Sequence, residues 1–381
     1  MPKVPGPLLR SSSLDDLLSF LAQDFSASFR HRIGFPDNLA CDFGDLERFW
    51  RHTLVNVGDP FTSTLYQVKT FSVERKCIEW FAELYNVEDC WGYVTSCGSE
   101  ANLHGALIGR EEYPEGRYYF SAASHPCMPK IAKMLRLPYT EVAASPTGEM
   151  DYEDLARKLA PYGATPAVIN LNIGTTSLGA IDRVERVVEV LQRNCVPYYL
   201  HCDAALGGML LPFIPSAPKL DCTHLPIGSI SISGHKFIGS PVPCSIFLVD
   251  RSQVRKNLAF YKSDIGYPGS ADTTIGGSRS GLAPLVIWYA LCQRGDRFTD
   301  EVAACLSNAR YLAERLEEKG YSPILNDFST TVALETPSPE VCEKWQLMVE
   351  GQRSRVVVMQ HVDRPLIDEF LADLPNRSPG R

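Results

Sequence analysis

Four short groups of residues that could do chemistry each come directly after a β-like run of the sequence. Residues 96–100 (SCGSE) follow GYVT, residues 174–176 (GTT) follow VINLNI, residues 201–205 (HCDAA) follow PYYL, and residues 233–236 (SGHK) follow SISI. In a parallel α/β sheet, ligands bind at the carboxyl ends of the strands. We therefore expect the four groups to meet at one edge of a sheet and to form one site.

The chemistry that these groups share is that of pyridoxal 5'-phosphate. The small residues 96–100 open a helix, whose free N–H groups and positive dipole end suit a phosphate. Asp203 is an isolated carboxylate, His125 an aromatic base, and Lys236 an isolated amine. The cofactor uses a lysine on its aldehyde and a carboxylate on its ring nitrogen. Lys236 would need a lowered pKa, through desolvation and the cationic ring, to act as a nucleophile.

Competing binding motifs are absent from the sequence or poorly placed in it. Residues 276–281 (GGSRSG) do not match GxGxxG, and no GxxxxGK[ST] occurs. A metal site built from His201, Cys202 and Asp203 is disfavoured, because neighbours along a strand point to opposite faces. A lone lysine after a strand is usually a solvated turn residue, so the prediction rests on the order and spacing of the whole set. We predict no metal.

The elements around these groups alternate between β-like runs and helical patterns, which is typical of a mostly parallel sheet covered by helices. We expect a helical N-terminal segment over residues 1–58, including a helix from Leu14 to Ala22, and a large cofactor-binding domain over residues 59–290. A helix expected at 298–318 and two later strand-like runs predict a small α+β domain over residues 291–381.

The composition of the sequence limits the compartments and the binding partners that are expected for the protein. The 381 residues are 45% hydrophobic, enough for a large core, and carry a net charge of -8. The basic residues are scattered, which argues against nucleic acid and against a membrane surface. The twelve cysteines are dispersed, which favours free thiols in a reducing compartment. No apolar run approaches the roughly 18 residues of a membrane span, and no secretion signal opens the sequence. We expect a cytoplasmic protein, and a short organelle-targeting segment at the N-terminus is the alternative.

Four stretches of the sequence resemble one known family. They are YVTSCGSEANLHGALIGRE, NIGTTSLGAIDRVERV, YLHCDAALGGMLLPF and SISGHKFIGSPVPCSIF. Together they are similar to the group II pyridoxal-phosphate decarboxylases, in the short branch that contains plant serine decarboxylase and bacterial histidine decarboxylase. The resemblance runs from about Gly34 to residue 358. It implies an aminotransferase-like type I fold with a seven-stranded sheet, and a homodimer with active sites at the subunit interface, a tetramer being the alternative.

The resemblance also implies roles for residues around the cofactor ring. Carried over to this sequence, Lys236 holds the cofactor covalently, and Asp203 pairs with the ring nitrogen. His125 stacks on one face of the ring, while Ala205 packs against the other. Thr176 lies beside the ring and the substrate carboxylate.

The remaining implied roles concern the phosphate and a proton. Gly98, Ser99, Ser233 and His235 would hold the phosphate group. Tyr267 would sit on a mobile loop and deliver a proton to Cα after carbon dioxide leaves. Lys236, His125 and Tyr267 are thus the expected catalytic residues.

The implied reaction is the decarboxylation of an L-amino acid to its amine, with L-serine to ethanolamine expected first and L-histidine to histamine next. Three departures leave other outcomes open. Where the branch usually reads SHYS and GSRNGH, this chain has Pro126, Ser280 and Leu282. The small-domain stretch EGQRSRVVVM also replaces a more usual acidic one. A decarboxylating aldehyde synthase and a catalytically degenerate paralogue with a structural role are therefore the alternative readings.

Overall fold

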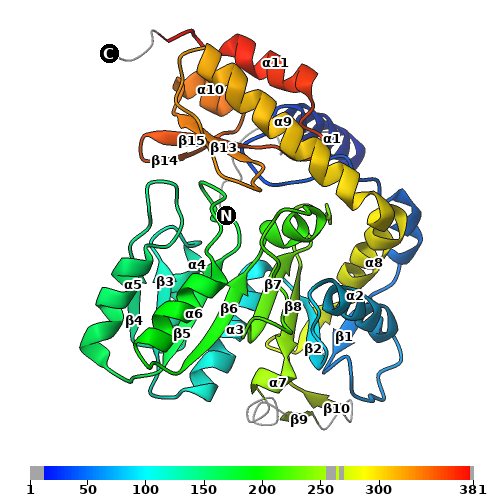
Figure 1. Ribbon diagram of the computed structural model, residues 1–381. Coiled ribbons are helices and arrows are strands. Elements are labelled where there is room, and N and C mark those ends of the chain that lie inside the picture. Colours follow the sequence, from blue (N-terminus) through cyan, green and yellow to red (C-terminus); the bar gives the residue numbers. More distant parts are fainter. Residues whose placement is uncertain (1–12, 255–262, 266–269, 378–381) are drawn as a thin grey trace, which may run out of the picture.

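A seven-stranded sheet forms the centre of the larger part of the molecule (Figure 1). The computed structural model describes residues 13–254, 263–265 and 270–377. β8 is antiparallel to both of its neighbours and the other pairs are parallel, so the predicted mostly parallel sheet is confirmed. The order across the sheet is β2 (Cys90–Thr95), β8 (Ser245–Asp250), β7 (Ser229–Ser233), β6 (Tyr198–Asp203), β5 (Ala167–Asn172), β3 (Arg117–Ser121) and β4 (Tyr139–Val142).

The strands that precede the predicted site residues end at the same edge of this sheet. β5, β6 and β7 are parallel neighbours, and their register aligns Asn172 with Asp203 and Asp203 with Ser231. β2 runs in the same direction, because β8 is antiparallel to both β2 and β7. The residues that follow these four strands therefore emerge side by side.

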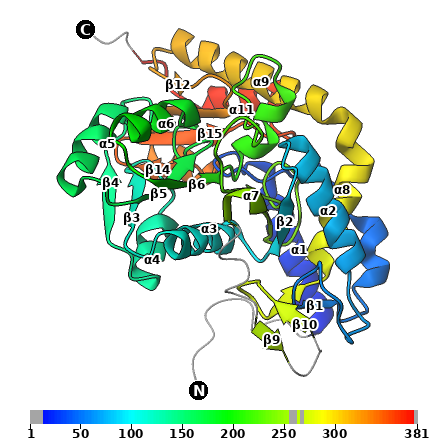
Figure 2. The same ribbon diagram turned by 60° about the horizontal axis from the view of Figure 1, so that its bottom comes forward.

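Helices cover both faces of the sheet, and side chains of each strand alternate between the two cores. On β6, Tyr199 joins the apolar cluster under α3 (Gly98–Glu112) and α4 (Cys127–Met134), whereas Leu200 and Cys202 join the larger cluster on the opposite face (Figure 2). That larger cluster includes residues of α2 (Phe71–Leu84), α5 (Tyr152–Leu159), α6 (Val184–Arg193) and α8 (Leu282–Arg294).

A second, antiparallel sheet organises the C-terminal part of the chain (Figure 1). Its strands are, in order, β12 (Ile324–Leu325), β13 (Thr331–Glu335), β15 (Arg353–Val357) and β14 (Met348–Glu350). Its helices are α9 (Phe298–Glu318), α10 (Pro339–Lys344) and α11 (Arg364–Asp373). α9 spans the residues that the helical spacing predicted. The N–H of Val357 donates to the carbonyl of Ile33 at 2.8 Å, so the N-terminal segment also contacts this part.

The N-terminal helix α1 (Leu14–Arg30) continues beyond the expected end at Ala22. Two further strand pairs are β1 (Val55–Val57) with β11 (Ser278–Ser280) and β9 (Ser263–Ile265) with β10 (Ser270–Asp272). The remaining short helices are α7 (Arg251–Val254), η2 (Gly44–Phe49), η3 (Ala160–Tyr162), η4 (Gly207–Met209), η5 (Leu211–Phe213) and η6 (Gly295–Arg297). Within the described ranges, no helix combines the length and the apolar character that crossing a bilayer requires.

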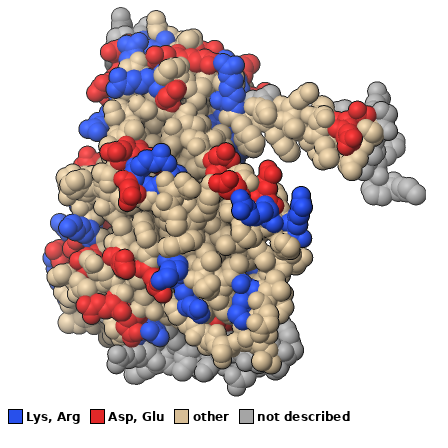
Figure 3. All heavy atoms as spheres, turned by 90° about the vertical axis from the view of Figure 1, so that its right-hand side faces the viewer, with Lys and Arg blue, Asp and Glu red and all other residues tan. Residues whose placement is uncertain are grey.

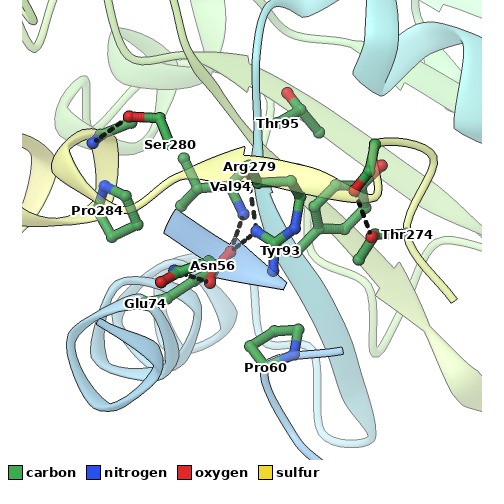
Figure 4. Close-up of polar contacts among 12 residues, drawn as sticks. Asn56, Pro60, Glu74, Tyr93, Val94, Thr95, Thr274, Arg279, Ser280 and Pro284 are labelled. Atoms are coloured by element: carbon green, nitrogen blue, oxygen red, sulfur yellow. Dashed lines mark hydrogen bonds and ion pairs between the residues drawn. The ribbon is translucent and has the colours of Figure 1, made fainter. Parts of the chain in front are cut away.

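A buried ion pair connects α2, β2 and β11, which are far apart in the sequence, next to the outer strand of the large sheet (Figure 4). Arg279 of β11 pairs with Glu74 of α2, and their side chains are 1% and 0% exposed. Glu74 also accepts from the backbone N–H of Val94 at 2.8 Å and from Asn56 Nδ2 at 2.7 Å. Arg279 donates to the carbonyl oxygens of Val94 and Gly58 at 3.2 and 3.0 Å. The carboxylate thus has three donors, which offset much of the free energy required to bury it.

Removing one partner of this pair should destabilise the protein strongly. We expect Arg279→Met to lower the free energy of unfolding by about 3 to 5 kcal/mol, because Glu74 would be left charged and buried without its cation. The double variant Arg279→Met with Glu74→Met should lose less, since no uncompensated charge remains. Urea denaturation followed by circular dichroism measures both.

The control is Arg251→Met, which removes an ion pair with Asp89 that is 47% and 39% exposed. We expect this change to cost less than about 1 kcal/mol, as is usual for solvent-exposed pairs. Equal losses for the buried and the exposed arginine would contradict the role given to the buried pair.

Candidate active site

One cavity of about 180 Å³ brings together nine of the ten predicted site residues. It lies at the carboxyl edge of the large sheet, and Phe328, Ser329 and Val357 close it from the C-terminal part. The nine residues are Gly98, Ser99, His125, Thr176, Asp203, Ala205, Ser233, His235 and Lys236. The tenth, Tyr267, lies outside the described residues. The structure thus places the nine together, and their individual roles stay predictions.

The amino end of α3 forms one corner of the cavity. α3 begins at Gly98 without a side-chain cap, which leaves N–H groups of its first turn available to a ligand. A Cβ atom at Gly98 would lie 3.2 Å from Ser233 Oγ, so glycine permits this close approach of β7. His235 Nδ1 lies 3.0 Å from the carbonyl oxygen of Cys244. Hydroxyl and backbone amide donors therefore lie at a corner that suits an anion.

Asp203 ends β6 with its carboxylate held by uncharged donors. Asn102 Nδ2 donates to Oδ2 at 2.9 Å, and the backbone N–H of Ala205 donates to Oδ1 at 3.2 Å. Asp203 is only 8% exposed. Because both donors are neutral, they stabilise the anion and leave its negative charge uncancelled.

Lys236 lies in a tight turn that follows β7. The turn is fixed because the N–H of Gly234 donates to the carbonyl of Cys244 at 2.9 Å. Asn38 and Gln360 both donate to the carbonyl oxygen of Phe237, at 3.0 and 3.1 Å. Desolvation lowers the pKa of Lys236, and the negative charge of Asp203 opposes part of that shift. A lowered pKa increases the fraction of neutral, nucleophilic amine at physiological pH.

His125 precedes α4 and is oriented by that helix. The N–H of Cys127 donates to His125 Nδ1 at 3.2 Å, which leaves Nε2 to carry the proton of the neutral ring. Burial is the main cause that lowers the pKa of His125. The imidazole at the cavity is therefore uncharged near neutral pH and can stack on an aromatic ring.

This set of groups fits pyridoxal phosphate. The uncapped first turn of α3 matches a phosphate, the amine of Lys236 an aldehyde, and the carboxylate of Asp203 a protonated ring nitrogen. Each group stands at the same cavity, as the chemistry of one cofactor requires.

Sequence reasoning missed the three side chains of the cavity lining that carry an amide or guanidinium group: Asn102, Asn172 and Arg355. Asn172 is the last residue of β5, so the strand-end rule that found Asp203 would have found it as well. Asn102 stands inside a helix, and Arg355 in the small sheet, where no spacing relates them to the other groups. Their placement follows from the tertiary fold.

Arg355 is a buried cation shared by two cavities. It lines the first cavity and also a second one of about 640 Å³, and Thr175 and Thr176 likewise line both cavities. It is 7% exposed, and its Nη1 donates to Ser177 Oγ at 3.1 Å. Its buried Nε has no hydrogen-bond partner among the described residues. Such a group favours an anionic ligand.

The three departures from the usual branch pattern lie at different places. Pro126 lines the second cavity. Ser280 Oγ accepts from the N–H of Ala283 at 3.2 Å at the start of α8, and Leu282 is the first residue of that helix. Among the described residues of the two cavities, only Pro126 of the three is present.

Comparison with known proteins gives consistent matches. The model of the pyridoxal-dependent decarboxylase conserved domain matches residues 61–333. The chain is 40% identical over 374 residues to Serine decarboxylase 1 of Oryza sativa subsp. japonica, covering 97% of this chain and 77% of that protein. It is 42% identical over 371 residues to Histidine decarboxylase of Solanum lycopersicum, covering 95% and 88%.

Among solved structures, L-methionine decarboxylase from Streptomyces sp. 590 superposes with a TM-score of 0.83 at 24% identity, covering 94% of each chain. At that identity the likeness concerns the fold. The expected type I fold, with its mixed seven-stranded sheet and small antiparallel sheet, is thereby confirmed.

The stability of the protein should fall in mild acid because of His201. Burial lowers the pKa of His201 to about 4, below the usual histidine value. As the pH falls below about 6.5, the unfolded chain takes up a proton before the folded chain does. We expect this residue to make the free energy of unfolding fall by about 1.4 kcal/mol per pH unit down to its folded pKa. Urea denaturation of the cofactor-loaded protein between pH 7.5 and 4.5 measures the slope.

The variant that isolates this residue is His201→Gln, which cannot take up the proton and should show a correspondingly shallower slope. His52→Gln, at an exposed position, is the control and should keep the wild-type slope. An unchanged slope in His201→Gln would rule out His201 as a source of the acid sensitivity.

Proposed function

Because the chain belongs to the pyridoxal-dependent decarboxylase family and is a pyridoxal-phosphate-dependent amino-acid decarboxylase, we propose that its reaction is the conversion of L-serine to ethanolamine and carbon dioxide. The observation that carries the chemistry is the meeting of Lys236, Asp203 and His125 at one cavity. Relatives named serine decarboxylase, 39% to 44% identical to this chain, support the choice of serine.

In the proposed reaction the cofactor, when bound, accepts the electron pair released as the bond between Cα and the carboxylate breaks. Asp203 keeps a proton on the ring nitrogen through its uncancelled charge. Lys236 in its neutral form would supply the amine that holds the cofactor aldehyde. His125 provides an uncharged ring surface. Tyr267, which lies outside the described residues, remains our proposed proton donor to Cα.

The substrate carboxylate also has a candidate partner. Arg355 is buried beside the cavity, and burial lowers the pKa of its guanidinium. A carboxylate would supply an acceptor for the Nε of this side chain, which has none among the described residues. Arg355 therefore supports an amino-acid substrate, whichever side chain that substrate carries.

L-histidine is the second candidate substrate. The tomato relative named histidine decarboxylase matches 95% of this chain at 42% identity. The second cavity, about 640 Å³ and next to Thr176, offers space for a larger side chain than that of serine. The two candidates thus differ in whether the substrate side chain extends past Thr176.

The deciding assay incubates the cofactor-loaded protein with each of the twenty amino acids and identifies amines by mass spectrometry. We expect ethanolamine from L-serine, and histamine would establish the second candidate instead. Lys236→Ala should lose at least about 1000-fold in turnover, because it lacks the amine that positions the cofactor. It should also lose the visible absorbance that a covalently held cofactor gives.

Lys130→Ala, which changes a lysine of α4 outside the cavity lining, is the control and should keep both properties. Normal cofactor absorbance without any amine product would refute decarboxylation and favour a structural or other-outcome role. Retained absorbance in Lys236→Ala would mean that another lysine holds the cofactor.

We further propose that the chain works as a homodimer through α1. In Figure 3, α1 forms an arm that projects from the body of the molecule and carries few charged residues. Leu14, Leu18, Phe25 and Phe29 recur on one side of this helix and are 68%, 54%, 53% and 46% exposed. A stripe of this kind normally packs against a partner. A second copy of the chain is the partner that the family resemblance implies.

Light scattering after size-exclusion chromatography should give the mass of two chains, and a mass of four would indicate a tetramer. The double variant Leu18→Asp with Phe25→Asp should shift the protein toward the monomer, because charge would enter the apolar stripe. Gln23→Asp, on the opposite side of α1, is the control and should leave the mass unchanged. A monomeric wild type would contradict the proposal.

The state of the cysteines supports a cytoplasmic location. All twelve cysteines are free thiols, as expected in a reducing compartment. Microscopy of the full chain fused to a fluorescent protein would test this location.

A further inference from the structure

A row of buried polar side chains leads from the core of the large domain to Asp203. Tyr199 OH donates to Ser229 Oγ at 2.7 Å, and Ser229 Oγ lies 2.8 Å from His201 Nδ1. His201 Nε2 lies 2.9 Å from Asn102 Oδ1, and Asn102 Nδ2 donates to Asp203 Oδ2 at 2.9 Å. The four contacts form a continuous chain of hydrogen bonds that ends at the carboxylate of the cavity.

The donors and acceptors of these groups allow only one direction for the hydrogen bonds of the row. The amide nitrogen of Asn102 faces Asp203, so its Oδ1 must accept from His201 Nε2. A neutral imidazole carries one N–H, which leaves His201 Nδ1 to accept from the hydroxyl of Ser229. Ser229 in turn accepts from Tyr199. Every hydrogen in the chain therefore points toward Asp203.

All five side chains are deeply buried, which keeps water from replacing any link. His201 is 0% exposed, Ser229 1%, Asn102 2%, Tyr199 4% and Asp203 8%. Burial also holds His201 in its neutral form by lowering its pKa to about 4. Ser231 Oγ donates a further hydrogen bond to Asn102 Oδ1 at 2.6 Å and fixes the amide in the same orientation.

Local features of the sequence allow this row of hydrogen bonds to form. Tyr199, His201 and Asp203 are alternate residues of β6 and so face the same side, toward α3. Glycine in α3 makes room for them: a Cβ atom at Gly105 would lie 2.3 Å from His201 Nδ1, and one at Gly109 would lie 2.8 Å from a ring carbon of Tyr199. The helix can therefore approach β6 closely enough for Asn102 to reach the carboxylate.

We propose that Asn102, His201, Ser229 and Tyr199 act as positioning residues that orient and stabilise the Asp203 carboxylate as an anion opposite the cofactor ring nitrogen. The inference rests on the proposed function, because it concerns the same cofactor. Donors aligned in one direction polarise each other, so Asn102 becomes a stronger donor than an isolated amide. A cationic partner would compete with the ring for the charge of Asp203, and this neutral chain does not.

The decisive variant is Ser229→Ala, which removes one link and adds no bulk. Without that hydroxyl His201 Nδ1 loses its donor, so the imidazole polarises the Asn102 amide less and Asn102 becomes a weaker donor to Asp203. We expect kcat to fall roughly tenfold with little change in KM. Tyr199→Phe, which removes only the first donor, should have a smaller effect in the same direction.

The readout specific to this role is the ¹⁵N chemical shift of ¹⁵N-labelled pyridoxal phosphate bound to each variant, titrated against pH. In Ser229→Ala the ring nitrogen should lose its proton at lower pH than in the wild type. Tyr118→Phe is the control for Tyr199→Phe. The hydroxyl of Tyr118 contacts Met128 Sδ at 3.2 Å in the same core and takes no part in the row of hydrogen bonds that ends at Asp203.

A ring-nitrogen titration in Ser229→Ala identical to that of the wild type would overturn the proposal, even if kcat fell through a structural effect. The titration also separates this proposal from the proposed substrate. It needs only bound cofactor, so it can be measured whether or not the wild type releases ethanolamine from L-serine.

Discussion

The close packing of α3 against β6 and β7 is the constraint on which the site depends. The same helix presents its uncapped amino end at Gly98 to one corner of the cavity and its Asn102 amide to Asp203 one turn later. These two contacts are fixed together, because a helix is a rigid body over so short a distance. A shift of α3 along the sheet would disturb both ends of the cofactor site at once.

Much of the site could be predicted from the sequence, because it consists of residues that follow parallel strands. Asp203 and Lys236 are found in this way, since strand ends meet at one sheet edge irrespective of the details of packing. Asn102 could not be found, because a polar residue inside a helix is ordinary until its neighbour across the sheet is known. Arg355 lies in a different sheet, and only the packing of the two parts brings it to the cavity.

In the proposed reaction, the groups for the cofactor and the groups for the substrate come from different parts of the fold. Groups that suit the cofactor come from the large sheet and α3, whereas Arg355 and the wall of the second cavity formed by Met348–Glu350 come from the small sheet. Pro126, the departure that lines the second cavity, belongs to the substrate side as well. Under this proposal, changes in the small sheet would alter the substrate groups and leave Asp203 and Lys236 in place.

The pair formed by Arg279 and Glu74 has a consequence for the order in which the chain is built. Its partners are separated by 205 residues. The ion pair can therefore form only after Arg279 has been synthesised and has left the ribosome. Contacts of such long range slow folding, because a large loop must close before they form. During synthesis α2 and β2 therefore remain incompletely assembled until β11 has been made, and Glu74 stays without its cation for that time.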